Sequence, residues 1–76
     1  MPRQPTIKSV QREIGRRLRV ARLAAGMTQE DVASAAWIDP KRYQRAEAGA
    51  VNPTVKTLLR LAGAIGIDFW SLLSGR

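Results

Sequence analysis

The polar residues with the clearest chemistry are four hydrogen-bond donors within the short segment 40–48. Lys41, Gln44 and Arg45 are three and four residues apart, so a helix would place them on one face. Lys and Arg donate to guanine O6 and N7 in the DNA major groove, and Gln can pair with adenine. Arg42 would point about 100° away from Lys41, toward a phosphate. These residue types indicate contact with DNA.

Ordinary surface ion pairs are the competing interpretation of the same cations. Arg42 could pair with Asp39, and Arg45 could pair in the neighbourhood of Glu47. The sequence leaves both interpretations open.

The chain offers little that could perform catalysis. It contains no His and no Cys, and its adjacent carboxylates are those of Glu30 and Asp31. Without a nucleophile and base, a metal-ligand set or a Gly-rich phosphate loop, neither an active site nor a metal centre can be assembled. We therefore expect no enzymatic activity, no cofactor and no metal.

Two short helices are predicted to position the donors, over 29–36 and 40–48. Thr28 is a good N-cap for the first helix. Asp39 caps the second, and Pro40 takes its first helical position, where the missing N–H costs nothing. Two such helices joined by a tight turn form a helix-turn-helix, whose second helix enters the major groove.

The rest of the chain adds three helices and an arm. Residues 1–9 are expected to form a flexible basic arm, followed by one domain over 10–76. Apolar periodicity and capping signals predict further helices over 10–25, 55–65 and 69–73. No alternating, strand-like segment occurs, so the predicted fold class is all-α with five helices.

The net charge of +7 favours a polyanionic partner. Seven basic residues lie in the first 22 positions: Arg3, Lys8, Arg12, Arg16, Arg17, Arg19 and Arg22. Simple solubilisation and binding to a membrane surface are the alternatives, but the first helix carries no aromatic membrane anchor. The longest apolar run, 61–67, is far too short for a membrane span. Together with the absence of Cys, this predicts a cytoplasmic protein without a membrane partner.

Five short motifs in register resemble the phage repressor and Cro type of helix-turn-helix, the XRE family. They are Thr28-Gln29-Glu30-Asp31-Val32-Ala33, Ile38-Asp39, Arg45-Ala46-Glu47-Ala48-Gly49, Asn52-Pro53-Thr54 and Leu58-Leu59-Arg60-Leu61-Ala62. The likeness runs from about Ile14 to Leu73 without insertions. It implies a lambda-repressor-like fold with the helix-turn-helix at its second and third helices, and a stand-alone repressor or controller of transcription.

The resemblance also assigns roles to individual residues. Gln29 would clamp the DNA backbone at a helix N-terminus, where phosphates bind well. Arg22 and Glu47 would form a partly buried ion pair that fixes the angle of the recognition helix. The residues that match the family's base-reading positions are Pro40, Lys41, Gln44 and Arg45. The remaining expected DNA contacts are Thr28, Arg42 and Asn52.

Two aromatic residues on the helix-turn-helix lead to separate expectations. Trp37 stands at the turn, where the family usually has Gly because φ can be positive there without strain. Either the turn bends differently or Trp37 accepts strain, and its indole is expected against the first helix or a neighbouring subunit. Tyr43 is expected in the core with its hydroxyl at the edge.

A domain with one recognition helix reads few base pairs, so a homodimer on a two-fold symmetric operator is expected. In the last helix Phe69, Leu72 and Leu73 should turn inward and leave Trp70 outside, beside Ile67, as the dimer interface. Alternatively Trp70 covers the core as a lid.

A different class of function also stays open. The chain could be an antitoxin-like protein-interaction module that binds a toxin or a polymerase subunit, with DNA binding secondary. The basic character of the segment 40–48 favours DNA.

Overall fold

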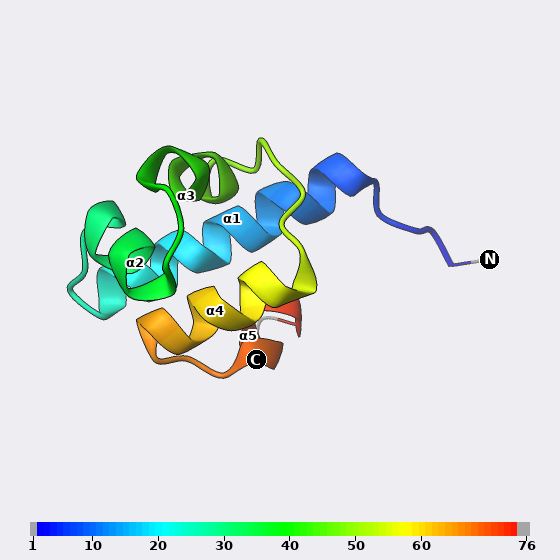
Figure 1. Ribbon diagram of the computed structural model, residues 1–76. Helices are drawn as coiled ribbons and strands as arrows, with labels where there is room; N and C mark the ends of the chain where they lie inside the picture. Colours follow the sequence, from blue (N-terminus) through cyan, green and yellow to red (C-terminus); the bar gives the residue numbers. More distant parts are fainter. Residues whose placement is uncertain (1, 75–76) are drawn as a thin grey trace.

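The computed structural model describes residues 2–74, and over that range its regular structure consists of five α-helices. They are α1 (Ile7–Ala24), α2 (Gln29–Ala36), α3 (Pro40–Glu47), α4 (Val55–Ile65) and α5 (Phe69–Ser74). In Figure 1, α3 lies on one side of α1 and α4 on the other. Contacts join α2 to α3 and α4, and α5 to α1 and α4. The all-α fold class is confirmed.

The expected bounds of α2 and α4 match the structure, and the expected start of α1 is wrong. α1 begins at Ile7 because Thr6 acts as its N-cap, accepting a 3.0 Å hydrogen bond from the Ser9 N–H. Residues 7–9 therefore belong to the helix and not to the arm. Residues 2–5 run away from the helices (Figure 1).

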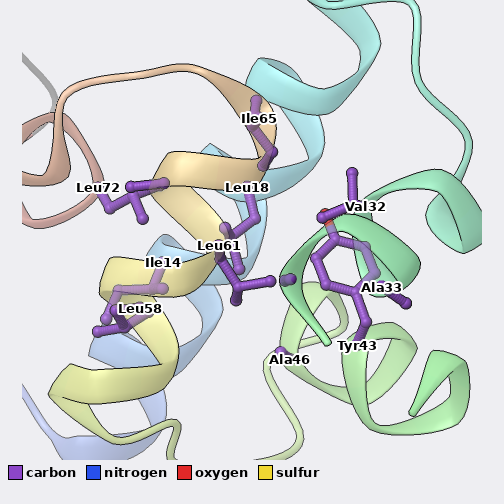
Figure 2. Packing of buried hydrophobic residues seen from close by; sticks show 12 residues of the cluster. Ile14, Leu18, Val32, Ala33, Tyr43, Ala46, Leu58, Leu61, Ile65 and Leu72 are labelled. Atoms are coloured by element: carbon purple, nitrogen blue, oxygen red, sulfur yellow. The ribbon is translucent and has the colours of Figure 1, made fainter. Parts of the chain in front are cut away.

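The core lies where all five helices meet. Figure 2 shows Tyr43 of α3 beside Val32 and Ala33 of α2. Tyr43 is fully buried, hydroxyl included, so the expectation that its hydroxyl would lie at the edge is wrong. Burial raises the pKa of this hydroxyl. The buried hydrophobic residues are Ile14, Leu18, Val32, Ala33, Ala36, Tyr43, Ala46, Leu58, Leu61, Ala62, Ile65 and Leu72.

A close crossing of α1 and α3 sets how α3 lies on the core. Gly15 of α1 packs directly against the end of α3, where an added Cβ would stand 2.7 Å from the carbonyl oxygen of Ala46 and also clash with that of Glu47. Any side chain at Gly15 would therefore push α3 away from α1. Sequence reasoning did not single out this glycine.

Helix α5 buries one side and exposes the other. Leu72 is fully buried, but Leu73 is substantially exposed, so the expectation that both would turn inward is wrong. Consecutive helical residues point about 100° apart, so a short surface helix that packs on the core with one side buries only one of two neighbouring side chains. Trp70 is 65% exposed and meets Phe69 edge to face, with ring centroids 5.1 Å apart. Ile67 packs partly against the core.

Trp37 adopts a strained backbone conformation at the turn between α2 and α3. It ends α2 with φ 59° and ψ 44°, in the left-handed region. Its N–H donates to the Ser34 carbonyl at 3.3 Å, and the Ile38 N–H donates to the Ala33 carbonyl at 3.0 Å. The residue is 88% exposed, so the expectation that its indole would lie against α1 is wrong.

Replacing Trp37 with glycine should stabilise the protein. Removing the left-handed strain outweighs the larger entropy loss of glycine, for a net gain of about 0.5 to 1 kcal/mol in the free energy of unfolding. Urea unfolding followed by circular dichroism measures this gain. Trp37→Ala, which keeps the strain but lacks the indole, is the matched control and should change stability little. A less stable Trp37→Gly protein would mean that indole contacts outweigh the strain.

Candidate nucleic-acid interface

A buried ion pair joins the end of α1 to the end of α3. Arg22 Nε donates to Glu47 Oε2 at 2.9 Å, and Arg22 Nη2 donates to Glu47 Oε1 at 2.8 Å. Both residues are at most 9% exposed. Two parallel bonds from a planar guanidinium fix orientation as well as distance. The structure thus places Arg22 and Glu47 together, as the resemblance implies.

Two further bonds tie the start of α2 to this ion pair. Arg22 Nη1 donates to the Met27 carbonyl at 3.0 Å, in the segment between α1 and α2. Gln29 Nε2 donates to Glu47 Oε1 at 3.3 Å. Sequence reasoning missed both bonds, because a backbone carbonyl leaves no trace in residue types and the position of Gln29 at a helix N-terminus indicates only a phosphate contact. An amide nitrogen carries two hydrogens, so Gln29 keeps one donor for a ligand.

The ion pair determines the protonation of its members. Burial is the largest single influence on the Glu47 carboxyl and would by itself raise its pKa, but the interactions with Arg22, Tyr43 and Gln29 together outweigh burial and lower that pKa on balance. The hydrogen bond with Glu47 raises the pKa of Arg22 in spite of burial. Both groups are therefore charged at neutral pH, and each compensates the other where water is largely excluded.

The N-terminus of α2 opens into a hollow beside α3. Thr28 Oγ1 accepts from the Asp31 N–H at 3.0 Å, while the Thr28 N–H donates to Asp31 Oδ2 at 2.8 Å, forming a complete capping box. The hollow has a volume of about 710 Å³, and Thr28, Gln29 and Gln44 line it together with Arg22. The structure thus brings three of the expected DNA-binding residues together.

The outer face of α3 is polar, exposed and without internal partners. Tyr43, Ala46 and Glu47 occupy its buried face. The exposed residues are Pro40, Lys41, Arg42, Gln44 and Arg45. Within residues 2–74, none of these side chains makes a hydrogen bond or an ion pair, so the expected alternative of surface ion pairs with Asp39 or Glu47 is wrong. The Asp39 carboxylate instead caps α3 by accepting from the Lys41 N–H at 2.8 Å.

Other expected residues lie away from this surface. Asn52, in the segment between α3 and α4, lines a different hollow beside Val10 and Gln11 of α1. Trp70 lies in α5, which packs on α1 and α4, and Ile67 lies in the segment just before α5. The structure therefore does not join these three residues to the hollow that contains Gln29.

Part of the basic run in α1 serves the fold. Arg16 Nη2 lies 2.6 Å from Glu13 Oε1, and Arg17 Nε lies 3.1 Å from the same oxygen. Arg17 Nη1 also donates to the Leu72 carbonyl at 3.0 Å, which fastens α5 to α1. The charge excess of this segment thus overstates the number of cations free for a polyanion.

Over the described range, no three His, Cys, Asp or Glu side chains are grouped as metal ligands would be. None of the described helices is both long and apolar enough to span a membrane.

The fold and this arrangement of side chains define a helix-turn-helix protein. A family model described as Helix-turn-helix matches residues 18–69. The chain belongs to this family, and the expectation of an XRE-type helix-turn-helix is confirmed.

Solved structures resemble the chain over most of its length. The restriction-modification controller protein C.AhdI from Aeromonas hydrophila has a TM-score of 0.82 and 31% identity, covering 84% of this chain and 97% of that one. A mutant of the controller protein C.Esp1396I has a TM-score of 0.77 and 25% identity, covering 84% and 89%. The clp gene regulator ClgR from C. glutamicum, at 23% identity and a TM-score of 0.80 over 92% and 87%, shares the fold. No curated protein sequence matches significantly.

Breaking the buried ion pair should destabilise the protein strongly. Arg22→Met leaves the Glu47 charge buried without a partner, and we expect a loss of about 3 kcal/mol in the free energy of unfolding. Adding Glu47→Gln should recover about 2 kcal/mol relative to additivity. Urea unfolding of the two single variants and the double variant measures this coupling.

The exposed pair of Arg16 and Glu13 provides the control for that cycle. Arg16→Met should change stability little, because exposed ion pairs contribute little. Strict additivity between Arg22→Met and Glu47→Gln would show that the two charges do not support the fold as a pair.

Proposed function

We propose that this helix-turn-helix regulator recognises a specific DNA sequence as a homodimer on a two-fold symmetric operator. The observation that carries the proposal is the outer face of α3, whose exposed donors have no partner in the part of the chain that the structure describes. Those donors stand on a helix whose inner face is locked by Glu47 and Tyr43. Rigid placement of unpaired donors is what reading base edges requires.

Each proposed contact follows from the position of the residue. Lys41, Gln44 and Arg45 read base edges in the major groove, and Arg42 binds a phosphate. Gln29 uses its second amide hydrogen on the phosphate bound at the N-terminus of α2. Pro40 belongs with these base-reading positions, and we include Thr28 and Asn52 as backbone-contacting positions that fix the register of the duplex.

The dimer follows from the small size of the site. One recognition helix covers few base pairs, so specificity needs a second copy roughly 34 Å away along the duplex. Exposed apolar side chains on α5, Trp70 and Leu73, are available for this contact. We include Ile67, which is half-buried and lies two residues before the helix, in the same interface. Ile67 also lines a hollow of about 330 Å³ with Val20 of α1, and Val20 is itself exposed.

The regulatory type is part of the same proposal. The controller proteins that resemble this chain are named for control of restriction-modification systems, which supports a controller or repressor here. Such a protein acts where the DNA is, so we place it in the cytoplasm. Control would come from its own concentration, because dimerisation and operator binding both depend on it.

Base-reading and phosphate-binding residues should respond differently to substitution. Lys41→Ala or Arg45→Ala should cost about 1 to 3 kcal/mol on the selected operator and little on random duplex. Gln29→Ala should weaken both alike. Fluorescence anisotropy with an operator recovered from co-purifying genomic fragments measures these affinities.

The salt dependence of the same titrations tests the contact surface. Log affinity should fall by roughly 0.9 per phosphate contact for each log unit of salt. Arg60→Ala, an exposed arginine on α4, serves as the matched control and should leave operator affinity nearly unchanged. A salt-independent affinity, or equal losses on operator and random duplex for Lys41→Ala, would contradict base reading by α3.

Removing the proposed dimer anchor should separate folding from association. Trp70→Ala should keep the helical circular dichroism, sediment as a monomer and bind a two-half-site operator much more weakly. Trp37→Ala removes the other exposed tryptophan and should leave the dimer intact. A dimeric Trp70→Ala protein, or one that unfolds, would show that the two-fold axis lies elsewhere or that Trp70 covers the core.

A further inference from the structure

Two residues that oppose the stability of the fold face the same groove between α2 and α4. Trp37 holds a left-handed conformation that glycine would adopt without strain. Gly63 stands inside α4, where alanine would be more favourable. Gly63 has no positive φ, and a Cβ built there meets nothing within 4 Å, so neither backbone geometry nor packing requires glycine. Residues that lower stability and that the local structure does not require are expected at functional surfaces.

The groove has the dimensions of a binding surface for a side chain or a helix. Its volume is about 470 Å³, and Trp37, Leu59, Arg60, Gly63 and three alanines line it. The indole is 88% exposed and Leu59 is exposed beside it, so an apolar surface of two elements faces outward. Gly63 keeps the floor of the groove flat because no side chain rises from it. An exposed aromatic next to a flat apolar floor is the arrangement of an interface anchor and its pocket.

The charge around the groove is positive and unpaired. Arg60 lines it, and Lys56 lies one turn earlier on α4, on the same side of the helix. Neither cation makes a hydrogen bond or an ion pair within the described part of the chain. The sequence of α4 contains no acidic residue. An occupant that compensates these cations must carry anionic groups, which in a protein partner are carboxylates.

We propose that this groove docks an acidic, amphipathic segment of a partner protein. Apolar side chains of that segment pack on Trp37, Leu59 and the floor at Gly63, and its carboxylates pair with Arg60 and Lys56. A second copy of this chain fits less well, because a self-complementary contact would bring the same cations together. DNA offers phosphates for the cations but nothing for an exposed indole over a flat apolar floor. This inference does not depend on the proposed operator or dimer.

The probe is a synthetic helical peptide with leucines along one face and glutamates along the other. In a Trp70→Phe background, Trp37 is the single tryptophan, so its emission reports directly on the groove. We expect saturable binding with a blue shift of that emission. Trp37→Gly and Arg60→Glu, measured by anisotropy of a labelled peptide, should each weaken binding at least roughly tenfold.

A pair of substitutions at the groove floor separates docking from folding. Gly63→Ala should raise the melting temperature, and Gly63→Leu should fill the floor and abolish peptide binding while helical circular dichroism is retained. Arg42→Glu, an exposed arginine on α3, is the matched control for Arg60→Glu. It should leave peptide affinity unchanged and lower affinity for random duplex DNA.

Several results would overturn the proposal. These are the absence of saturable peptide binding, equal binding of polyglutamate, and unchanged peptide affinity in Trp37→Gly. A loss of self-association in Trp37→Gly, seen by sedimentation without peptide, would reassign the groove to a second copy. A loss of duplex affinity in Arg60→Glu as large as that in Arg42→Glu would reassign it to DNA.

Discussion

The structure depends on one buried ion pair at the point where three helices meet. Arg22 of α1 and Glu47 of α3 bind each other through two hydrogen bonds, and Met27 and Gln29 attach the start of α2 to them. A chain of 76 residues has a modest core, so packing alone constrains helix orientation weakly. The ion pair adds direction, because a guanidinium and a carboxylate match in one planar geometry. Gly15 completes the constraint by allowing α3 to approach α1 closely.

This constraint divides the surface into faces with separate tasks. The residues of α3 that hold it in place, Tyr43, Ala46 and Glu47, are buried. No polar side chain on the other face has a partner among residues 2–74. Gln29 links the two faces, because it donates to Glu47 and borders the hollow at the start of α2. Any movement of the ion pair would therefore reach the proposed phosphate-binding and base-reading groups together. The groove at Trp37 lies outside this arrangement, which lets a second partner bind without disturbing it.

Sequence reasoning succeeded where the signal was local. Thr28 and Thr54 accept from backbone N–H groups as N-caps, and Gly66 ends α4 in the left-handed region, so the bounds of α2 and α4 followed from residue types. It failed at Thr6, an equally good cap, because the proline-containing segment before it suggested an arm.

The features that could not be predicted from the sequence are those that tertiary contacts determine. Three features depend on where other helices lie. They are the strained conformation of Trp37 at the turn, the burial of one of two neighbouring leucines in α5, and the bond from Arg22 to a backbone carbonyl.

The most direct test of the central constraint is to measure the free energy of unfolding of this protein and of Glu47→Gln as a function of pH. Because folding lowers the pKa of Glu47, its contribution is complete above the ordinary glutamate pKa of about 4.3 and is lost as pH falls through the lowered value. The difference in stability between the two proteins should therefore shrink steadily below that pH. A difference that stays constant down to acid unfolding would contradict the role given to the ion pair.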